Sequence, residues 1–372
     1  MVVQHCTMNI HDNPITKVLE KCKEDLENFK NAKVKCGIIG RSGTGKSSLI
    51  NAIVGEQVSA VGEVETTMKI SEPIEHKGLL FYDLPGSSTV NFPMDTYIDT
   101  MGINNFDCVI LVTSDRFFED DLYLITEIAK LKIPVFPVRT KFDFSIDRAL
   151  KRGISEEETY STIYADLKKS LEGYAVKGIY LTSADYPTKY DLNKLLDDIS
   201  NSLNSIKRER FIADVNVISH NLLKEKRDLS TKLVSRYAAL SAANGLNPIP
   251  GLDISVDLGL LYKMSVDIQE IYGLKKEQIH YSSSLLGDNK SKLIVAKAIQ
   301  FTSKYIGKEA ILLLLKRAGM SFAGKEISKW IPFVGQAIAA GLGFKLTSSI
   351  GNNMLTDAEE IASQTFEAIK VG

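Results

Sequence analysis

The sequence predicts an α/β fold: a doubly wound domain with a mostly parallel sheet, joined to an all-helical domain formed by the C-terminal part and an N-terminal helix. Short apolar runs alternate with longer helical patterns over residues 34–205, and strand signals disappear after about residue 205. Residues 14–30 carry apolar side chains at helical spacing. A chain of 372 residues exceeds the usual size of one core, so we expect more than one domain.

The elements are expected in the following order. A helix over residues 14–30 starts at Pro14, whose fixed φ suits the first helical position. Five strands are expected at residues 34–39, 79–82, 108–112, 133–138 and 179–181. Helices over residues 122–131, 159–171 and 192–203 are expected to cover the sheet. The predicted domains are a leading helical segment (1–32), the α/β domain (33–205) and the helical domain (206–372).

The composition is that of an ordinary globular protein, with 44% apolar and 24% charged residues. With 45 Lys and Arg against 46 Asp and Glu, the chain has no broad basic field, so we expect no nucleic-acid partner. The cysteines form no CxxC pair, which argues against zinc and against a disulfide framework. The first twenty residues lack the apolar run of a signal peptide. We therefore expect a cytoplasmic protein.

A phosphate-binding loop (P-loop) is predicted at residues 40–47, which fit the pattern GxxxxGK[ST] between a predicted strand and a predicted helix. The glycines let backbone amides turn inward around phosphates, and the helix N-terminus adds positive potential. Lys46 supplies a mobile cation to the β- and γ-phosphates, and Ser47 is the expected ligand of Mg²⁺. The residues expected to bind here are Gly40, Ser42, Gly43, Thr44, Gly45, Lys46, Ser47 and Ser48.

A second phosphate contact is predicted at Asp83-Leu84-Pro85-Gly86, directly after the predicted strand 79–82. Asp83 can hold a magnesium-bound water, and the amide of Gly86 can donate to the γ-phosphate. When the motif stands alone, a surface turn explains an aspartate and a glycine at this spacing equally well. Its order after the P-loop favours the nucleotide role.

The base is predicted to bind at Thr140-Lys141-Phe142-Asp143, which follows the predicted strand 133–138. Asp143 can accept hydrogen bonds from the ring N–H and the amine of guanine, whereas adenine would leave its carboxylate unpaired. Lys141 can lay its stem along the base. Thr140 stands where Asn is commoner, so we expect the loss of an amide that ties this segment to the P-loop. GTP and GDP are the predicted ligands.

Two further segments complete the predicted nucleotide site. Ser183 and Ala184 follow the last predicted strand and are expected to contact the guanine carbonyl oxygen, although an ordinary turn explains them as well. In the segment before strand 79–82, Thr67 is the expected ligand of Mg²⁺ and of the γ-phosphate. Thr66 is the alternative, because one of two neighbouring hydroxyls faces the metal while the other faces away.

The residue after Gly86 is Ser87, where small signalling GTPases place a Gln that orients the attacking water. We therefore expect slow intrinsic hydrolysis and a replacement from elsewhere. Glu65 could position or deprotonate the water, and Arg41 or Arg116 could offset transition-state charge within the chain or across a dimer. The alternative for each arginine is an ordinary solvated charge.

Together, residues 40–47, 65–67, 83–97 and 139–143 resemble the immunity-related, interferon-inducible GTPase family. The segment from Asp83-Leu84-Pro85-Gly86 to Asp95-Thr96-Tyr97 is the most distinctive part, and Thr at position 140 is also typical of that family. The resemblance covers roughly residues 34–185, and the helical remainder is similar to the family's C-terminal helical domain.

The resemblance implies a dynamin-like cycle in which GTP-bound molecules pair through their nucleotide faces, hydrolyse cooperatively and act on intracellular membranes. Glu65 matches the family's switch glutamate implicated in hydrolysis. Arg116 matches an arginine near the family's pairing surface, which places it above Arg41 as the residue acting on a partner molecule. The residues implied in catalysis are Lys46, Glu65 and Arg116, and those implied in holding Mg²⁺ are Ser47, Thr67 and Asp83.

Membrane contact has one candidate segment, residues 330–344, which is uncharged but too short to span a bilayer. Lys325 and Lys329 precede it, so an interfacial helix is conceivable, with packing in the protein core as the alternative. Two other function classes stay open from the sequence: a nucleotide-gated scaffold with negligible hydrolysis, and an RNA- or ribosome-associated GTPase. The absence of a basic tail disfavours the latter.

Overall fold

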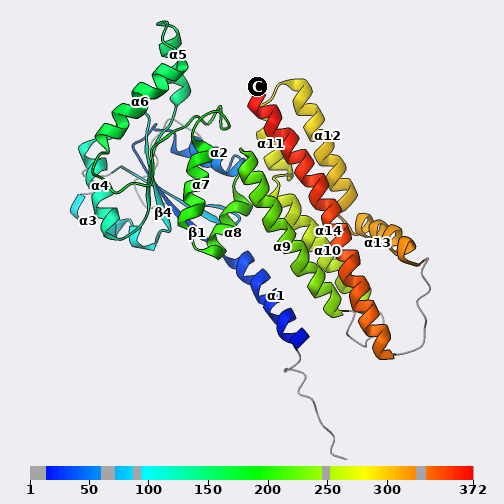
Figure 1. The fold of residues 1–372 in the computed structure, drawn as a ribbon. Coiled ribbons are helices and arrows are strands. Elements are labelled where there is room, and N and C mark those ends of the chain that lie inside the picture. Colours follow the sequence, from blue (N-terminus) through cyan, green and yellow to red (C-terminus); the bar gives the residue numbers. More distant parts are fainter. Residues whose placement is uncertain (1–13, 60–71, 87–93, 245–251, 324–331, 372) are drawn as a thin grey trace, which may run out of the picture. The chain divides into compact units, whose positions relative to one another are not determined.

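A computed structural model describes residues 14–59, 72–86, 94–244, 252–323 and 332–371 (Figure 1). Its elements in chain order are α1 (Pro14–Asn31), β1 (Val34–Ile39), α2 (Lys46–Val54), β2 (Ile74–His76), β3 (Leu79–Leu84), α3 (Met94–Thr100), the 3-10 helix η2 (Ile103–Asn105), β4 (Cys108–Thr113), α4 (Glu119–Lys130), β5 (Val135–Arg139), α5 (Phe142–Leu150), α6 (Glu156–Ser170), β6 (Tyr180–Leu181), α7 (Leu192–Ser202), α8 (Ser205–Asp214), α9 (His220–Asn244), α10 (Leu252–Ile271), α11 (Lys276–Ser284), α12 (Asp288–Tyr305), α13 (Lys308–Ala323) and α14 (Pro332–Val371).

The chain forms two compact units. The sheet unit comprises Ala32–Glu225, Gly273–Val295 and Ala362–Gly372, and the helical unit comprises Met1–Asn31, Lys226–Tyr272 and Ala296–Ile361. The division into domains at residues 32 and 205 stays a prediction.

The sheet has six strands in the order β2-β3-β1-β4-β5-β6. All neighbours are parallel except β2 and β3, which are antiparallel. Every residue of β4 is buried, as expected for a parallel strand covered on both faces. The predicted α/β fold with a mostly parallel sheet is confirmed.

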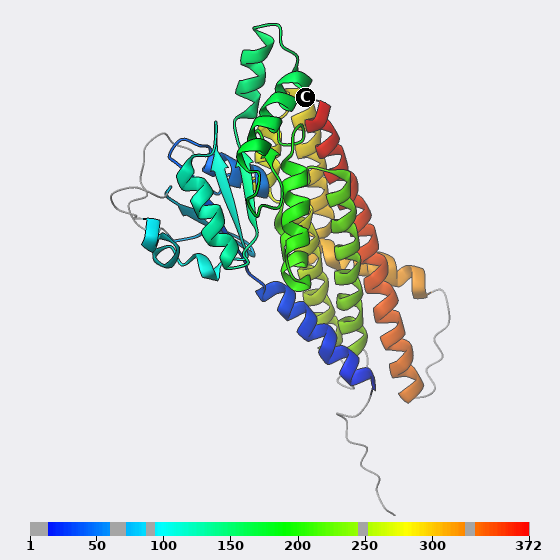
Figure 2. The same cartoon turned by 60° about the vertical axis from the view of Figure 1, so that its left-hand side comes forward.

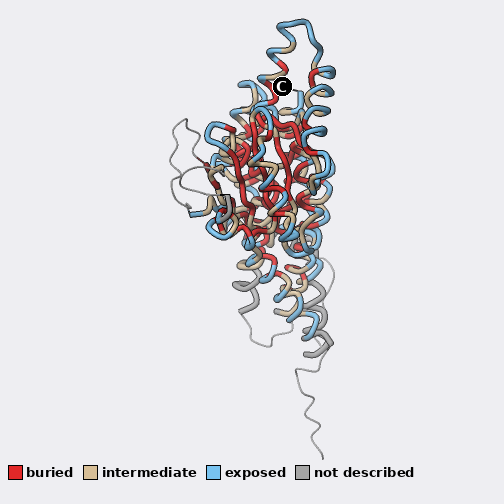
Figure 3. The backbone as a smooth tube through the Cα atoms, turned by 90° about the vertical axis from the view of Figure 1, so that its left-hand side faces the viewer, coloured by how far each residue is buried: buried red, intermediate tan, exposed pale blue. Residues whose placement is uncertain are grey.

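Helices cover both faces of the sheet. Figure 1 shows α3, α4 and α6 on one face and α2, α7 and α8 on the other. Alternate strand residues such as Val109 and Leu111 join Leu124 and Ile128 of α4 in one buried cluster. The buried residues concentrate in the strands (Figure 3). This rigid core fixes the sheet edge from which the candidate site is built.

The elements of the sheet unit that were missing from the prediction include β2, α3 and α5. The strand β2 has only three residues and joins β3 through a two-residue turn, Lys77-Gly78, in which Lys77 has a positive φ of 54°. Such a short edge strand leaves too little alternating pattern to recognise. Helix α5 begins at Phe142, inside the predicted base-binding segment, so Asp143 lies on the first turn of a helix.

In the helical unit, α14 packs closely on α9 and α10, where a Cβ at Gly351 would lie 2.6 Å from Val234 and 3.1 Å from the Sδ atom of Met264. Figures 1 and 2 show these three helices side by side. Helix α1 joins them through Lys30, whose Nζ lies 3.1 Å from the Asp267 carboxylate. Burial raises the pKa of Asp267, and Lys30 opposes that shift. The predicted helical C-terminal part is confirmed.

Among the residues that the structure describes, no helix is long and apolar enough to cross a bilayer. Of the candidate membrane segment, residues 330 and 331 lie outside the described residues, and Pro332 starts α14. The use of this segment at a membrane stays a prediction.

Candidate functional site

The predicted P-loop connects the end of β1, in the middle of the sheet, to the first turn of α2. Two of its glycines are required by the geometry. Gly45 has a φ of 87°, a left-handed conformation that side chains rarely adopt, and a Cβ at Gly40 would collide with the carbonyl oxygen of Val112. The loop therefore lies tightly against β4, with its last residues turned into the positive end of α2.

Lys46 lies inside this loop. Its Nζ donates to the carbonyl oxygens of Gly40 (2.8 Å) and Arg41 (3.2 Å), and it lies 3.5 Å from Oδ1 of Asp83. The lysine side chain is only 12% exposed. The loop thus holds one ammonium group where the predicted triphosphate would bind.

Asp83, near the end of β3, has a carboxylate oxygen that could bind a cation. Its Oδ1 atom is buried and has no hydrogen-bond partner among the described residues. Burial raises the pKa of Asp83, and the nearby Lys46 only partly offsets that effect. A carboxylate oxygen with no hydrogen-bond partner among the described residues and the Ser47 hydroxyl at the start of α2 are the kinds of donor that a hard cation such as Mg²⁺ prefers. The residues present therefore fit the predicted magnesium ion.

Gly86 follows the end of β3 and lies beside the P-loop. A Cβ at Gly86 would come within 3.4 Å of Cγ of Arg41. The structure therefore brings the second predicted phosphate contact next to the first.

The base-binding segment is tied to the P-loop by Thr140 itself, which corrects our expectation of a lost tie. The buried hydroxyl of Thr140 donates to the carbonyl oxygen of Thr44, and it lies 3.2 Å from the carbonyl oxygen of Thr113. The amide of the commoner Asn is absent, as expected, but the hydroxyl supplies a tie that the sequence did not predict. A shorter hydroxyl makes the same connection when the two loops approach closely.

The residues predicted to bind guanine line one hollow of about 100 Å³. Lys141 has a left-handed φ of 55° at the start of α5, and the backbone N–H of Phe142 donates to the carbonyl oxygen of Thr182 (3.1 Å). This hydrogen bond holds the segment against the loop after β6. The lining residues are Gly45, Ser48, Leu49, Thr140, Lys141, Asp143, Phe144, Thr182, Ser183, Ala184 and Asp185.

Besides Leu49 and Thr182, two further lining residues were not predicted from the sequence, Phe144 and Asp185. Each stands one position beyond a predicted contact, Asp143 in one case and Ala184 in the other. Their adjacency to the motifs was the available signal. It could not show that α5 turns Phe144 toward the hollow.

Arg41 and Arg116 meet at one aromatic ring. The guanidinium carbon of Arg41 lies 3.7 Å from the centre of the Phe118 ring, and that of Arg116 lies 5.1 Å from it. Both arginines are exposed. The hydroxyl of Thr113 donates to the carbonyl oxygen of Arg116 (2.8 Å), which fixes the backbone there. Arg41 of the P-loop and Arg116 therefore share one ring, that of Phe118, which was not among the residues selected from the sequence.

The predicted first switch lies outside the described residues, and so do Glu65, Thr66, Thr67 and Ser87. Their roles stay predictions.

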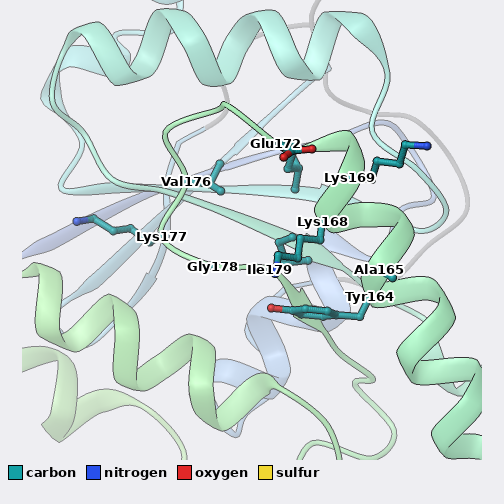
Figure 4. Close-up of a pocket in the computed structure, with 10 residues that line it drawn as sticks. Tyr164, Ala165, Lys168, Lys169, Glu172, Val176, Lys177, Gly178 and Ile179 are labelled. Atoms are coloured by element: carbon teal, nitrogen blue, oxygen red, sulfur yellow. The ribbon is translucent and has the colours of Figure 1, made fainter.

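A larger hollow, of about 500 Å³, opens elsewhere on the sheet unit (Figure 4). It is lined from α6 by residues such as Tyr164 and Lys168, and from the segment before β6 by residues such as Val176 and Ile179. That segment leads into the amino end of β6, whereas the P-loop follows the carboxyl end of β1. Nucleotides bind at the carboxyl edge of such sheets, so this hollow is not part of the candidate site.

The chain is similar to a known family and to several of its members. The model of a family described as interferon-inducible GTPase (IIGP) matches residues 1–325. Interferon-inducible GTPase 5 of Bos taurus is 25% identical, covering 95% of this chain and 80% of that protein. Interferon-inducible GTPase 1 of Mus musculus is 26% identical, covering 68% of this chain and 64% of that protein.

A solved structure of Era from Aquifex aeolicus, bound to GDP and AlF4⁻, is 20% identical over 59% of this chain and 69% of its own, with a TM-score of 0.34. The family match spans most of the chain and includes the P-loop and the base-binding segment. The chain therefore belongs to the interferon-inducible GTPase family and is a GTPase.

Proposed function

We propose that this GTPase uses Mg²⁺ to hydrolyse GTP, that GTP-bound molecules pair through their nucleotide faces, and that the pairs act peripherally on intracellular membranes from the cytoplasm. One observation carries the pairing: Arg41 of the P-loop and Arg116 are both exposed and share the ring of Phe118. A surface that presents two guanidinium groups next to the phosphates suits the charge of a second molecule's nucleotide.

The chemistry assigned to the chain is positioning and charge stabilisation. Lys46 and the inward amides of the P-loop would hold the β- and γ-phosphates, and Ser47 and Asp83 would hold the magnesium ion. When bound, magnesium supplies positive charge that polarises the phosphoryl oxygens. In this proposal Glu65 orients the attacking water, because Ser87 lacks the amide that a Gln would offer.

The reason for pairing lies in the transition state, where negative charge spreads over the transferred phosphoryl oxygens. A guanidinium group from a partner would stabilise that charge at the moment of reaction. Arg116 is preferred over Arg41 for this role, because Thr113 fixes the backbone of Arg116 while its side chain stays exposed.

The test is GTP turnover as a function of protein concentration, with gel filtration in GDP and in a non-hydrolysable GTP analogue. We expect the specific activity to rise with concentration and a dimer to form in the analogue. Arg116→Ala should lower the activity at high concentration at least about tenfold, whereas Arg152→Ala, an exposed arginine after α5, should leave it unchanged. A constant specific activity from a monomer would remove the pairing from the proposal.

Membrane action is tested separately by co-sedimentation with vesicles of anionic or neutral lipid, in GTP and in GDP. We expect more protein to sediment with vesicles in GTP. If no protein sediments with either lipid in either nucleotide, the membrane part of the proposal is wrong, and the hydrolysis part is unaffected.

A further inference from the structure

Tyr97 is a fully buried tyrosine next to the phosphate half of the site. It lies on the short helix α3 with no exposed surface, inside the cluster that includes Leu84 at the end of β3 and Leu124 of α4. Its hydroxyl donates a hydrogen bond to the carbonyl oxygen of Pro85. A buried hydroxyl of this kind needs a partner, and here the partner belongs to the predicted γ-phosphate segment.

The carbonyl group of Pro85 and the N–H group of Gly86 belong to the same peptide unit. This unit is planar and trans, so its C=O and N–H point in opposite directions. A hydroxyl that fixes the carbonyl therefore also fixes the direction of the Gly86 N–H. Because Tyr97 lies in the core, the N–H is turned away from the core. A Cβ built on Gly86 would lie 3.4 Å from Cγ of Arg41 in the P-loop, so this glycine is next to the phosphate-binding loop.

The hydroxyl of Tyr97 is suited to remain a hydrogen-bond donor. Burial, together with the negative charges of Asp121 and Asp83, raises its pKa above the ordinary value for tyrosine. The group therefore keeps its proton over the whole physiological range. Tight packing around the ring prevents it from turning to another acceptor.

We propose that Tyr97 is the positioning residue of the γ-phosphate contact: through the Pro85 carbonyl it aims the Gly86 amide at the site of the third phosphate. The inference rests on the proposed hydrolysis of GTP at this site and on the predicted role of Gly86. It explains how a contact at the start of a loop is prepared before the nucleotide binds. GDP has no third phosphate, so its binding should not depend on Tyr97.

The test is Tyr97→Phe, which keeps the ring and removes only the hydroxyl. The affinities for GDP and for the imidodiphosphate analogue of GTP are measured by calorimetry, together with kcat at saturating GTP. We expect the analogue to bind about five- to tenfold more weakly and kcat to fall by a similar factor, which is the effect of one lost hydrogen bond. The affinity for GDP should stay within about twofold, because its contacts are unchanged.

The matched control is Tyr180→Phe. Tyr180 is equally buried, and its hydroxyl donates to Asp198 (2.7 Å) instead of to the phosphate segment. It should show no selective loss for the analogue. Melting curves recorded with saturating GDP compare the folding of the variants, since bound ligand stabilises each of them.

Three results would overturn the inference. One is an equal loss of GDP and analogue binding in Tyr97→Phe, which would indicate a merely structural role. In the second, the wild-type protein hydrolyses GTP and Tyr97→Phe behaves as the wild type does. This result would contradict the inference and leave the proposed function intact. A wild-type protein that neither hydrolyses GTP nor binds the analogue overturns both.

Discussion

The base half and the phosphate half of the candidate site are built differently. In the base half, polar groups of the protein are hydrogen-bonded to one another. The Thr140 hydroxyl donates to the carbonyl oxygen of Thr44, and the Phe142 amide donates to that of Thr182. In the phosphate half, Lys46 lies 3.5 Å from an Asp83 oxygen that has no hydrogen-bond partner among the described residues. The base half is therefore a hollow held in place by internal hydrogen bonds, whereas the phosphate half brings charged side chains together. We therefore expect changes in the first to alter the affinity for GDP and GTP equally, and changes in the second to alter hydrolysis and the contacts with the third phosphate.

The largest effect should come from the charge of the phosphate half. Lys46→Ala removes the ammonium group from the P-loop and leaves Asp83 without its cationic neighbour. We expect kcat for GTP to fall at least about 100-fold, as when a preorganised charge contact to a transition state is lost. Turnover under saturating GTP measures this effect.

The preference for guanosine over adenosine nucleotides should survive in Lys46→Ala, because the base hollow is untouched. Lys151→Ala, an exposed lysine after α5, is the control and should leave turnover unchanged. A Lys46→Ala protein with normal kcat would contradict the division between the two halves.

The next effect concerns the choice of base. Asp143→Asn replaces an acceptor-only carboxylate with an amide, so guanine loses one charge-assisted hydrogen bond and meets a misplaced donor. We expect GTP to bind on the order of 100-fold more weakly, since hydrogen bonds to charged groups are the strong ones. Xanthosine triphosphate should bind better than it does to the wild type, because xanthine carries a carbonyl where guanine has its amine.

Competition binding with both nucleotides measures this change. The kcat for whichever nucleotide saturates the variant should stay close to the wild-type value. If Asp143→Asn weakened ATP and GTP equally, the carboxylate would be a structural group and not a reader of the base.

The third effect tests the tie between the halves. Thr140→Val keeps the shape and removes the hydroxyl, which leaves the Thr44 carbonyl oxygen without this donor. We expect GDP and the GTP analogue to bind equally more weakly, by about five- to thirtyfold, which corresponds to one or two lost hydrogen bonds. Thr140→Ser, which retains the hydroxyl, should bind nearly as the wild type does. A selective loss of the analogue would show that the tie serves the phosphate half instead.

Thr140 also shows which features of the site can be predicted from the sequence and which cannot. Its position after β5 was predictable, because the carboxyl ends of parallel strands meet at one edge of a sheet. The strand 34–39 was predicted with the bounds of β1, since a mostly apolar run directly before a glycine-rich loop is a clear pattern. The partner of the Thr140 hydroxyl was not predictable, because it depends on how closely two loops approach, and spacing along the chain does not contain that distance.

The same limit applies to the helix α5 and to Phe118. The first turn of α5 contains Phe142 and Asp143, which the sequence motif places in a loop. Their helical conformation depends on how α5 packs. Phe118 belongs to no motif that the sequence analysis selected. Its contact with Arg41 joins segments far apart in sequence, and such long-range contacts leave no periodic trace.

The smallest effect should come from the rim of the base hollow. Phe144 lines the hollow but is 53% exposed, so its ring can cover only part of a bound base. We expect Phe144→Ala to weaken GDP and the GTP analogue equally, by about two- to fivefold, the range of one partial aromatic contact. Leu150 lies on the same helix with the same 53% exposure and does not line the hollow, so Leu150→Ala is a matched control. If both variants lost the same affinity, the effect would come from α5 as a whole. If Phe144→Ala lowered kcat without changing either affinity, a residue of the base half would act on the chemical step. That result would contradict the division of the site into a base half and a phosphate half with different roles.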